Sequence, residues 1–193
     1  MILVSGEPGV GTTRLAEELA IWVERQGGHT ATARCHSTST FLPYAVIADW
    51  LRSPALQAQL AALDNPRLAE IARLAPEVQN ERSVRATPEP LVEDWQRQRF
   101  FEALAAPILL REQPLLLLID DLHRCDGETL DWLQYLMNTA EGAPLLVVGT
   151  AHSETVLAGH PLTALRLALQ QRGRWHDVRL GPLSAGELSL IHI

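Results

Sequence analysis

One run of apolar residues, at positions 115–119, constrains the fold of this chain more than any other segment. A strand with one face in water alternates apolar and polar residues, whereas this run contains only leucine and isoleucine. It therefore predicts the central strand of a parallel sheet that helices cover on both faces. Shorter apolar runs at 2–4 and 145–148 predict two further buried strands of the same sheet.

Helical and strand patterns follow one another between these runs. Residues 13–26 predict a helix, because Leu15, Leu19 and Val23 recur every four residues and so share one face. Residues 30–35 alternate in polarity and predict a strand next in the chain.

The remainder of the chain continues this alternation. Residues 43–75 predict short helices, residues 91–111 a longer helix, and Asp126 the N-cap of another. The pattern throughout predicts an α/β protein of three layers, with a parallel sheet and helices on both of its faces. The inward positions predicted for the longer helix are Trp95, Phe101, Leu104 and Ile108. The tryptophans are expected to pack against the core or against segments outside this chain; they are Trp22, Trp50, Trp95, Trp132 and Trp175.

Composition argues against several classes of function. The formal net charge is −7, and no basic patch of the kind that grips nucleic acid is visible, so direct DNA binding is not expected. No apolar run approaches the length of a membrane span, and a cytoplasmic domain without membrane contact is expected. Cys35 and Cys125 lack the spacing of metal ligands and are expected to be reduced thiols, and the scattered histidines lack it too.

A glycine-rich loop follows the first predicted strand and opens the first predicted helix. It nearly fits G-x-x-x-x-G-K-[ST], in which glycines let backbone N–H groups turn toward phosphate oxygens at a helix N-terminus. Thr13 supplies a hydroxyl for Mg²⁺. Taken alone, the loop also fits a plain strand-to-helix turn. The candidate phosphate-binding residues are Gly6, Glu7, Pro8, Gly9, Val10, Gly11, Thr12, Thr13 and Arg14.

Two carboxylates end the apolar run. Asp120 is predicted to hold Mg²⁺ together with Thr13, and Asp121 to be the catalytic residue that orients and polarises the attacking water. Two solvated acids at the end of a strand are the alternative interpretation. The combination of loop, acid pair and a third strand that ends at Gly149 and Thr150 is more specific than any of its parts.

The sequence resembles the ATPase module of STAND-type NTPases, in the AAA-like subgroup found in large bacterial LuxR-type and SARP-type transcriptional regulators. The resemblance covers residues 1–187 and implies a P-loop NTPase fold. It also implies that the strand at 147–150 lies between the loop strand and the Asp-Asp strand. The residues that carry it are the loop with Thr13-Arg14-Leu15, Ala33-Arg34-Cys35, Leu42-Pro43-Tyr44, Phe100-Phe101-Glu102-Ala103, Asp120-Asp121-Leu122-His123, Gly149-Thr150 and Gly181-Pro182-Leu183-Ser184.

Two positions depart from the family pattern. Thr12 stands where the loop lysine reaches the β- and γ-phosphates, and His152 stands where an arginine commonly lies near the γ-phosphate. Both changes remove positive charge from the phosphate end of the site. His152 can donate to phosphate when protonated, or it can be an ordinary loop histidine. Arg14 is a poor substitute for the lysine, because the family carries both.

The resemblance implies a switch function. It implies an ATP-binding switch domain that binds ATP·Mg²⁺ and hydrolyses it slowly or not at all, with ATP and a small-molecule or protein inducer favouring an open, self-associated state. A DNA-binding domain beyond this chain would act on promoters. The alternatives are a degenerate, non-catalytic module for interaction and autoinhibition, and an origin-recognition-type AAA ATPase.

The chain end carries its own expectation. Residues 1–187 are expected to be an ATPase domain truncated at both ends, with Ser184 and Glu187 opening a further helix. Residues 188–193 resemble the in-frame translation of a sequencing adapter, and a native tail is the alternative.

Overall fold

The fold is built on a five-stranded parallel sheet in the order β2-β3-β4-β1-β5. The computed structural model describes residues 1–36, 43–79, 91, 93–155 and 159–182. This order places β4 between β1 and β3, which confirms the strand position that the family resemblance implied. The strands are β1 (Ile2–Gly6), β2 (His29–Arg34), β3 (Leu115–Asp120), β4 (Leu145–His152) and β5 (His176–Arg179).

Strand β3 is buried along its whole length, as the apolar run predicted. Its alternate residues enter two different cores, because successive side chains of a strand point to opposite faces. Leu115, Leu117 and Ile119 belong to the larger core, and Leu116 and Leu118 to the smaller one. The strand therefore joins the two helical layers through its own side chains.

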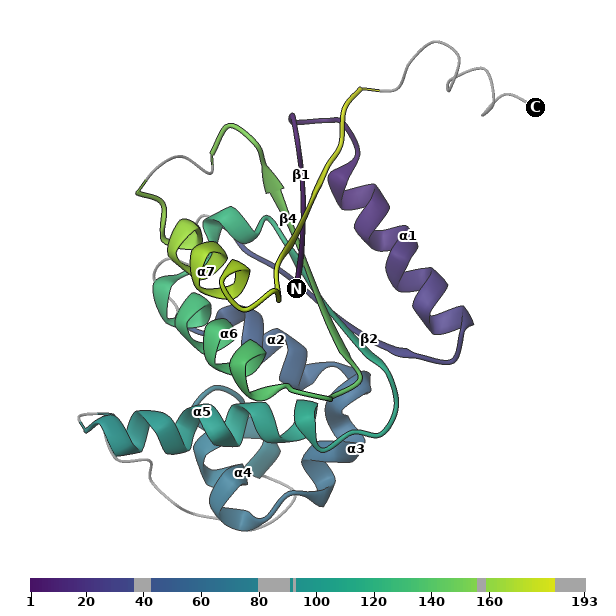
Figure 1. The fold of residues 1–193 in the computed structure, drawn as a ribbon. Coiled ribbons are helices and arrows are strands. Elements are labelled where there is room, and N and C mark those ends of the chain that lie inside the picture. The colour runs from purple at the N-terminus through teal and green to yellow at the C-terminus, as the bar shows by residue number, and fades with distance from the viewer. Residues whose placement is uncertain (37–42, 80–90, 92, 156–158, 183–193) are drawn as a thin grey trace.

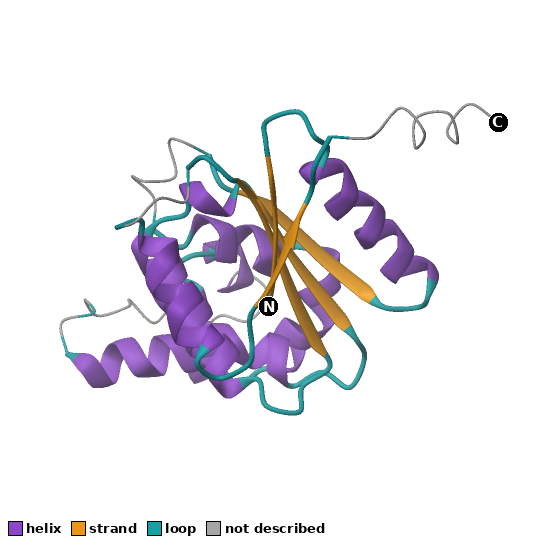
Figure 2. Cartoon of the chain, turned by 45° about the horizontal axis from the view of Figure 1, so that its top comes forward, coloured by secondary structure: helices purple, strands orange, loops and turns teal. Residues whose placement is uncertain are grey.

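The helices form two unequal layers (Figures 1 and 2). Helix α1 (Thr12–Arg25) stands by itself on one side of the sheet in both views, and the other helices gather on the opposite side. This confirms the three-layer α/β fold. The second layer comprises α2 (Ala45–Arg52), α3 (Pro54–Ala62), α4 (Asn65–Ile71), α5 (Asp94–Leu109), α6 (Gly127–Thr139) and α7 (Pro161–Gln170), with the short 3-10 helices η2 (Pro76–Gln79) and η3 (Leu122–Arg124).

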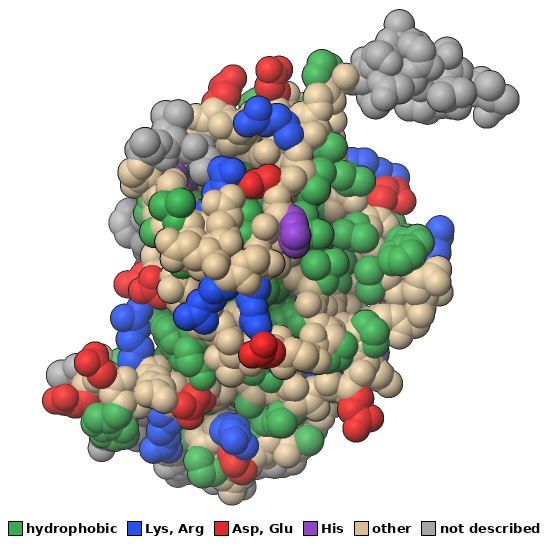
Figure 3. All heavy atoms as spheres, in the orientation of Figure 1, with side chains coloured by type: hydrophobic (Ala, Val, Ile, Leu, Met, Phe, Trp, Pro, Cys, Tyr) green, Lys and Arg blue, Asp and Glu red, His purple; other side chains and the backbone are tan. Residues whose placement is uncertain are grey.

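Helix α1 contacts the sheet through small residues. Ala16 and Ala20 are its buried apolar positions, while Leu19 packs at the margin of the smaller core and Leu15 is 43% exposed. The apolar face predicted from Leu15, Leu19 and Val23 is therefore not buried at Leu15. The alanines form the contact instead, because they allow the helix backbone to lie close to the sheet. Hydrophobic side chains gather on the surface over α1 (Figure 3). The exposed hydrophobic residues of this helix include Trp22.

The aromatic residues divide into buried and exposed sets. Trp50 and Trp132 are fully buried, and the Trp50 indole N–H donates to the carbonyl of Leu118 at 3.2 Å. Trp95 is 59% exposed in the first turn of α5, so its predicted inward position was wrong. Trp22 is 58% exposed, so packing against the core is excluded for it as well. Among the described residues, no helix has the length and apolar character needed to cross a membrane.

Gly149 allows η3 to lie against β4. A Cβ added there would meet Leu122, which is fully buried, at 3.2 Å from its Cβ and closer still to a terminal methyl. We expect Gly149→Ala to lower the free energy of unfolding by about 1–3 kcal/mol, because the buried leucine has to shift. Urea denaturation measures this change.

Gly127→Ala is the matched control, since a Cβ at Gly127 meets nothing within 4 Å and the residue opens α6. This substitution should be neutral or slightly stabilising. Equal loss of stability in the two variants would contradict the close contact of Gly149 with Leu122.

Candidate functional site

The loop between β1 and α1 contains two glycines in left-handed backbone conformation. Gly9 has φ 85° and Gly11 has φ 100°, a region that side chains with a Cβ rarely adopt. A Cβ added at either residue meets nothing within 4 Å, so the space around the loop is open there. Consecutive turned peptides of this kind, at the start of a 14-residue helix, can cradle an anion.

Thr12 is the first residue of α1, directly after the loop, and it is buried, with 7% of its surface exposed. Its methyl group would lie 3.3 Å from a Cβ added at Gly6, so the side chain is turned toward the end of β1. A threonine in this place contributes no charge. The exposed residues Glu7 and Pro8 complete the loop, and the carbonyl of Glu7 accepts from the N–H of Val10 at 3.2 Å.

The structure brings Thr13 and Asp120 together, although they are 107 residues apart in the sequence. The Thr13 hydroxyl donates to Asp120 Oδ1 at 2.9 Å, and the Thr150 hydroxyl donates to the same oxygen at 2.6 Å. Helix α1, β3 and β4 therefore meet at one carboxylate. Carboxylate and hydroxyl oxygens are ligands that suit Mg²⁺, so this donor set fits the predicted ion.

The described residues include no cluster of three His, Cys, Asp or Glu side chains that could hold a metal alone. An ion at Asp120 would therefore need further oxygens from a nucleotide and from water.

Asp121 turns away from the strand in a left-handed conformation, with φ 58°. Its backbone N–H donates to the Thr150 hydroxyl at 3.0 Å, so one threonine positions both acids. The carboxylate of Asp121 is 15% exposed and that of Asp120 is 10% exposed. Two neighbouring carboxylates with little water around them repel each other, and this repulsion calls for a nearby cation.

Arg34 supplies that cation. The parallel register of β2 and β3 pairs Arg34 with Asp120. The guanidinium lies 3.4 Å from Asp120 Oδ2 through Nε, and 3.1 Å from Asp121 Oδ2 through Nη2. The hydrogen bond to Asp121, then the negative charge of Asp120, raises the pKa of Arg34 above its usual value. The sequence predicted no role for Arg34, since the register of two strands is not visible in a motif.

His152 lies at the end of β4 and is paired with Gly6, the first residue of the loop. Its Nε2 is 3.9 Å from Asp121 Oδ1, and its ring lies against that of His123 at a centroid distance of 4.9 Å. Burial lowers the pKa of His123, against the opposing effect of the Asp121 charge, so His123 is neutral at pH 7. The structure thus brings His152 to the loop.

Arg14 does not join this cluster. Its side chain is 73% exposed, and its guanidinium pairs with Glu18 one turn further along α1. A second contact that the sequence did not predict involves the residue after Arg34. The sulfur atoms of Cys35 and Cys125 are 3.0 Å apart. These two thiols are free, and Cys35 is buried.

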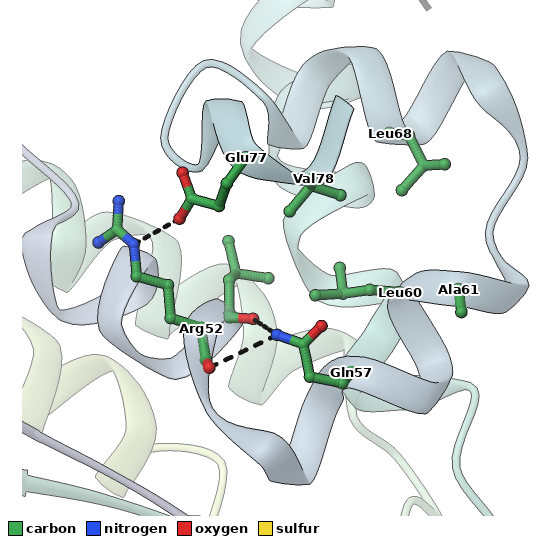
Figure 4. Close-up of a pocket in the computed structure, with 8 residues that line it drawn as sticks. Arg52, Gln57, Leu60, Ala61, Leu68, Glu77 and Val78 are labelled. Atoms are coloured by element: carbon green, nitrogen blue, oxygen red, sulfur yellow. Dashed lines mark hydrogen bonds and ion pairs between the residues drawn. The ribbon is translucent and has the colours of Figure 1, made fainter. Parts of the chain in front are cut away.

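One cavity lies beside the candidate site, and another lies among the helices that follow β2. One of about 420 Å³ adjoins the site, and its lining includes Thr13, Glu17, Arg34, Asp49 and Asp120. The other, of about 270 Å³, lies in the helical segment between β2 and β3, where Arg52 and Glu77 meet above apolar side chains (Figure 4).

A family model described as AAA ATPase domain matches residues 1–148. This match covers more than half of the 193 residues. The chain belongs to the AAA ATPase domain family. Use of nucleotide and Mg²⁺ is a general property of that family, and the oxygens around Asp120 suit it.

One solved structure supports the fold of this AAA ATPase domain, and a second is similar at a lower TM-score. Cdc6p from Pyrobaculum aerophilum is similar at 16% identity with a TM-score of 0.53, over 99% of this chain and 41% of that one. PCH-2 of C. elegans is also 16% identical, with a TM-score of 0.38 over 95% of this chain and 36% of that one. The domain thus spans less than half of either protein. Comparison with curated proteins found no match.

Thr150 should be essential to the geometry of the acid pair. We expect Thr150→Val, which keeps the shape and removes the hydroxyl, to lower the free energy of unfolding by about 1–3 kcal/mol, because a buried carboxylate loses a donor. Thr150→Ser keeps the donor and should lose clearly less. Chemical denaturation of both variants tests this, and equal losses would assign the role of Thr150 to its methyl group.

Proposed function

We propose that this chain is an ATP·Mg²⁺-binding switch domain of a bacterial transcriptional regulator, with slow or absent hydrolysis. The observation that carries the proposal is the meeting of Thr13, Asp120 and Thr150 at the mouth of the glycine loop. An acid fixed in this way beside a helix N-terminus is arranged for a metal-bound phosphate chain.

Each group has a separate task in this proposal. Backbone N–H groups of the loop and the N-terminus of α1 bind the phosphates. Thr13 and Asp120 hold Mg²⁺, which would neutralise charge on the phosphates. Asp121 orients the attacking water and accepts its proton, and His152 donates to the terminal phosphate when it is protonated.

The charges around the site account for slow turnover. Thr12 is neutral and buried, so it brings no positive charge to the phosphate end of the site. The transferred phosphate would therefore meet fewer fixed positive charges than efficient phosphoryl transfer requires. For the same reason the site should discriminate weakly between ATP and ADP.

The regulator role rests on the resemblance to STAND modules in LuxR-type and SARP-type proteins. A net charge of −7 agrees with a domain that leaves DNA contact to another part of the protein. In this proposal an inducer and ATP shift the domain toward an open state that self-associates, within the cytoplasm.

A degenerate, non-catalytic module is the second candidate. Two observations favour it: Thr12 replaces the loop lysine, and Arg34 already pairs with both acids. The likeness to Cdc6p concerns the fold, so it adds no separate support for an origin-recognition function.

The two acids should separate binding from turnover. We expect Asp121→Asn to abolish ATP hydrolysis while leaving ATP binding largely intact, because its carboxylate acts on water. Asp120→Asn should weaken Mg²⁺-dependent ATP binding itself. Calorimetric titration and phosphate release on the purified protein measure both effects, and parallel loss of binding and turnover in Asp121→Asn would reassign that residue to the metal or to structure.

Restoring the loop cation should strengthen the site. We expect Thr12→Lys to tighten ATP binding by about 2–4 kcal/mol, the scale of a charge-assisted contact with little water around it, and to raise hydrolysis. Thr12→Ala, which is equally neutral, should change ATP binding little.

Titration with ATP, ADP and Mg²⁺ tests both variants. Tight ATP binding by the native sequence, unimproved by lysine, would show that another cation serves the phosphates. Binding by neither version would establish the degenerate module.

A further inference from the structure

We propose that Arg34 is a built-in counter-cation, which holds the Asp120–Asp121 pair when Mg²⁺ is absent and competes with Mg²⁺ for the Asp120 carboxylate. Through this competition Mg²⁺ enters the site together with nucleotide rather than alone. The inference rests on the proposed function in one respect, that Asp120 is a Mg²⁺ ligand.

The position of Arg34 follows from the sheet. Strands β2 and β3 pair in parallel from His29 opposite Leu115 to Arg34 opposite Asp120. One residue further, the backbone N–H of Cys35 donates to the carbonyl of Asp120 at 2.9 Å. Backbone pairing on both sides of Arg34 therefore fixes its Cα beside the acids, whatever its side chain does.

The contacts of the acids leave the guanidinium and Mg²⁺ in competition. Asp120 Oδ1 accepts from two threonine hydroxyls, and Asp120 Oδ2 faces Arg34 Nε at 3.4 Å. Asp121 Oδ2 accepts from Arg34 Nε at 3.3 Å and from Nη2 at 3.1 Å. An ion bound at Asp120 must displace this guanidinium from Asp120 Oδ2, since two cations on the same carboxylate repel each other.

Arg34 is free enough to be displaced. Its side chain is 59% exposed, whereas the carboxylates that it contacts are 10% and 15% exposed. The cavity of about 420 Å³ that it lines also contains Glu17 and Asp49, so other acids lie near its path. Thr150 holds the Asp120 carboxylate and the backbone of Asp121, and the guanidinium is the movable partner.

Nucleotide changes the balance of this competition. A Mg²⁺ ion arriving alone gains the Asp120 carboxylate at the cost of an ion pair that is already formed. Phosphate oxygens add ligands to those that the described residues supply at Asp120, and their negative charge gives the released guanidinium an alternative partner. Thus Arg34 makes occupation of the metal site depend on the phosphate chain.

The test uses the protein without nucleotide, and compares native Arg34 with Arg34→Gln and Arg34→Lys. Thermal unfolding is followed in chelator and in millimolar Mg²⁺, and Mn²⁺ binding is titrated by electron paramagnetic resonance. We expect the native protein and Arg34→Lys to show almost no response to Mg²⁺. Arg34→Gln should unfold at a lower temperature in chelator, regain that loss in Mg²⁺, and bind Mn²⁺ about tenfold more tightly, the scale of one charge beside a carboxylate with little water around it.

Two further variants identify the source of the response. Adding Asp120→Asn to Arg34→Gln should abolish the gained Mn²⁺ affinity, which assigns the ion to this carboxylate. Arg52→Gln removes a guanidinium that pairs with Glu77 at 2.6 Å in the helical segment (Figure 4), and it should gain no response to Mg²⁺.

The outcomes separate this inference from the proposed function. If Arg34→Gln gains no response, or if Arg34→Lys gains it equally, the counter-cation is overturned even when ATP binds. If Arg34→Gln gains the response while no variant binds ATP, the counter-cation stands and the proposed switch function fails.

Discussion

The arrangement of the molecule depends on a strand that is buried on both faces. Because β3 sends alternate residues into two cores, neither helical layer can be removed without exposing it. The same burial leaves its carboxyl end among backbone and helix ends, where Asp120 has few water molecules to stabilise its charge. The hydroxyl groups of Thr13 and Thr150 replace that water, and so the core and the site are parts of one arrangement.

Positive charge in this site comes from the side opposite the glycine loop. The loop offers backbone N–H groups and a neutral threonine, while the guanidinium approaches from β2, beyond the acids. In the proposed function, phosphates and acids would therefore face different donors, with His152 lying 3.9 Å from Asp121 between them. Such a site would favour retention of a bound anion over its rapid cleavage, in agreement with the switch that we propose.

The sequence was a good guide to the elements and to the residues that meet at the sheet end. Thr13 and Asp120 could be brought together by reasoning because the carboxyl ends of parallel strands share one edge. The pairing of Arg34 with the acids could not, since it depends on where β2 is aligned along β3. The buried face of α1 was not predicted correctly at Leu15, because a pattern of large apolar residues does not reveal a close contact made by small ones. Ala16 and Ala20 make that contact. Residues 183–193, including the predicted tail, lie outside the described residues, as does the capping pair Ser184 and Glu187.

The left-handed turn at Asp121 limits which amino acids can occupy that position. Among residues with a Cβ, aspartate and asparagine tolerate this conformation best, because their short polar side chains can bond locally. A glutamate would extend further toward a ligand but would fit the backbone less well. The carboxylate of Asp121 is therefore on a short side chain that is fixed to a rigid turn. It has little reach, so a ligand has to bind close to this turn to contact it. Backbone shape therefore limits substitution at this position as much as charge does.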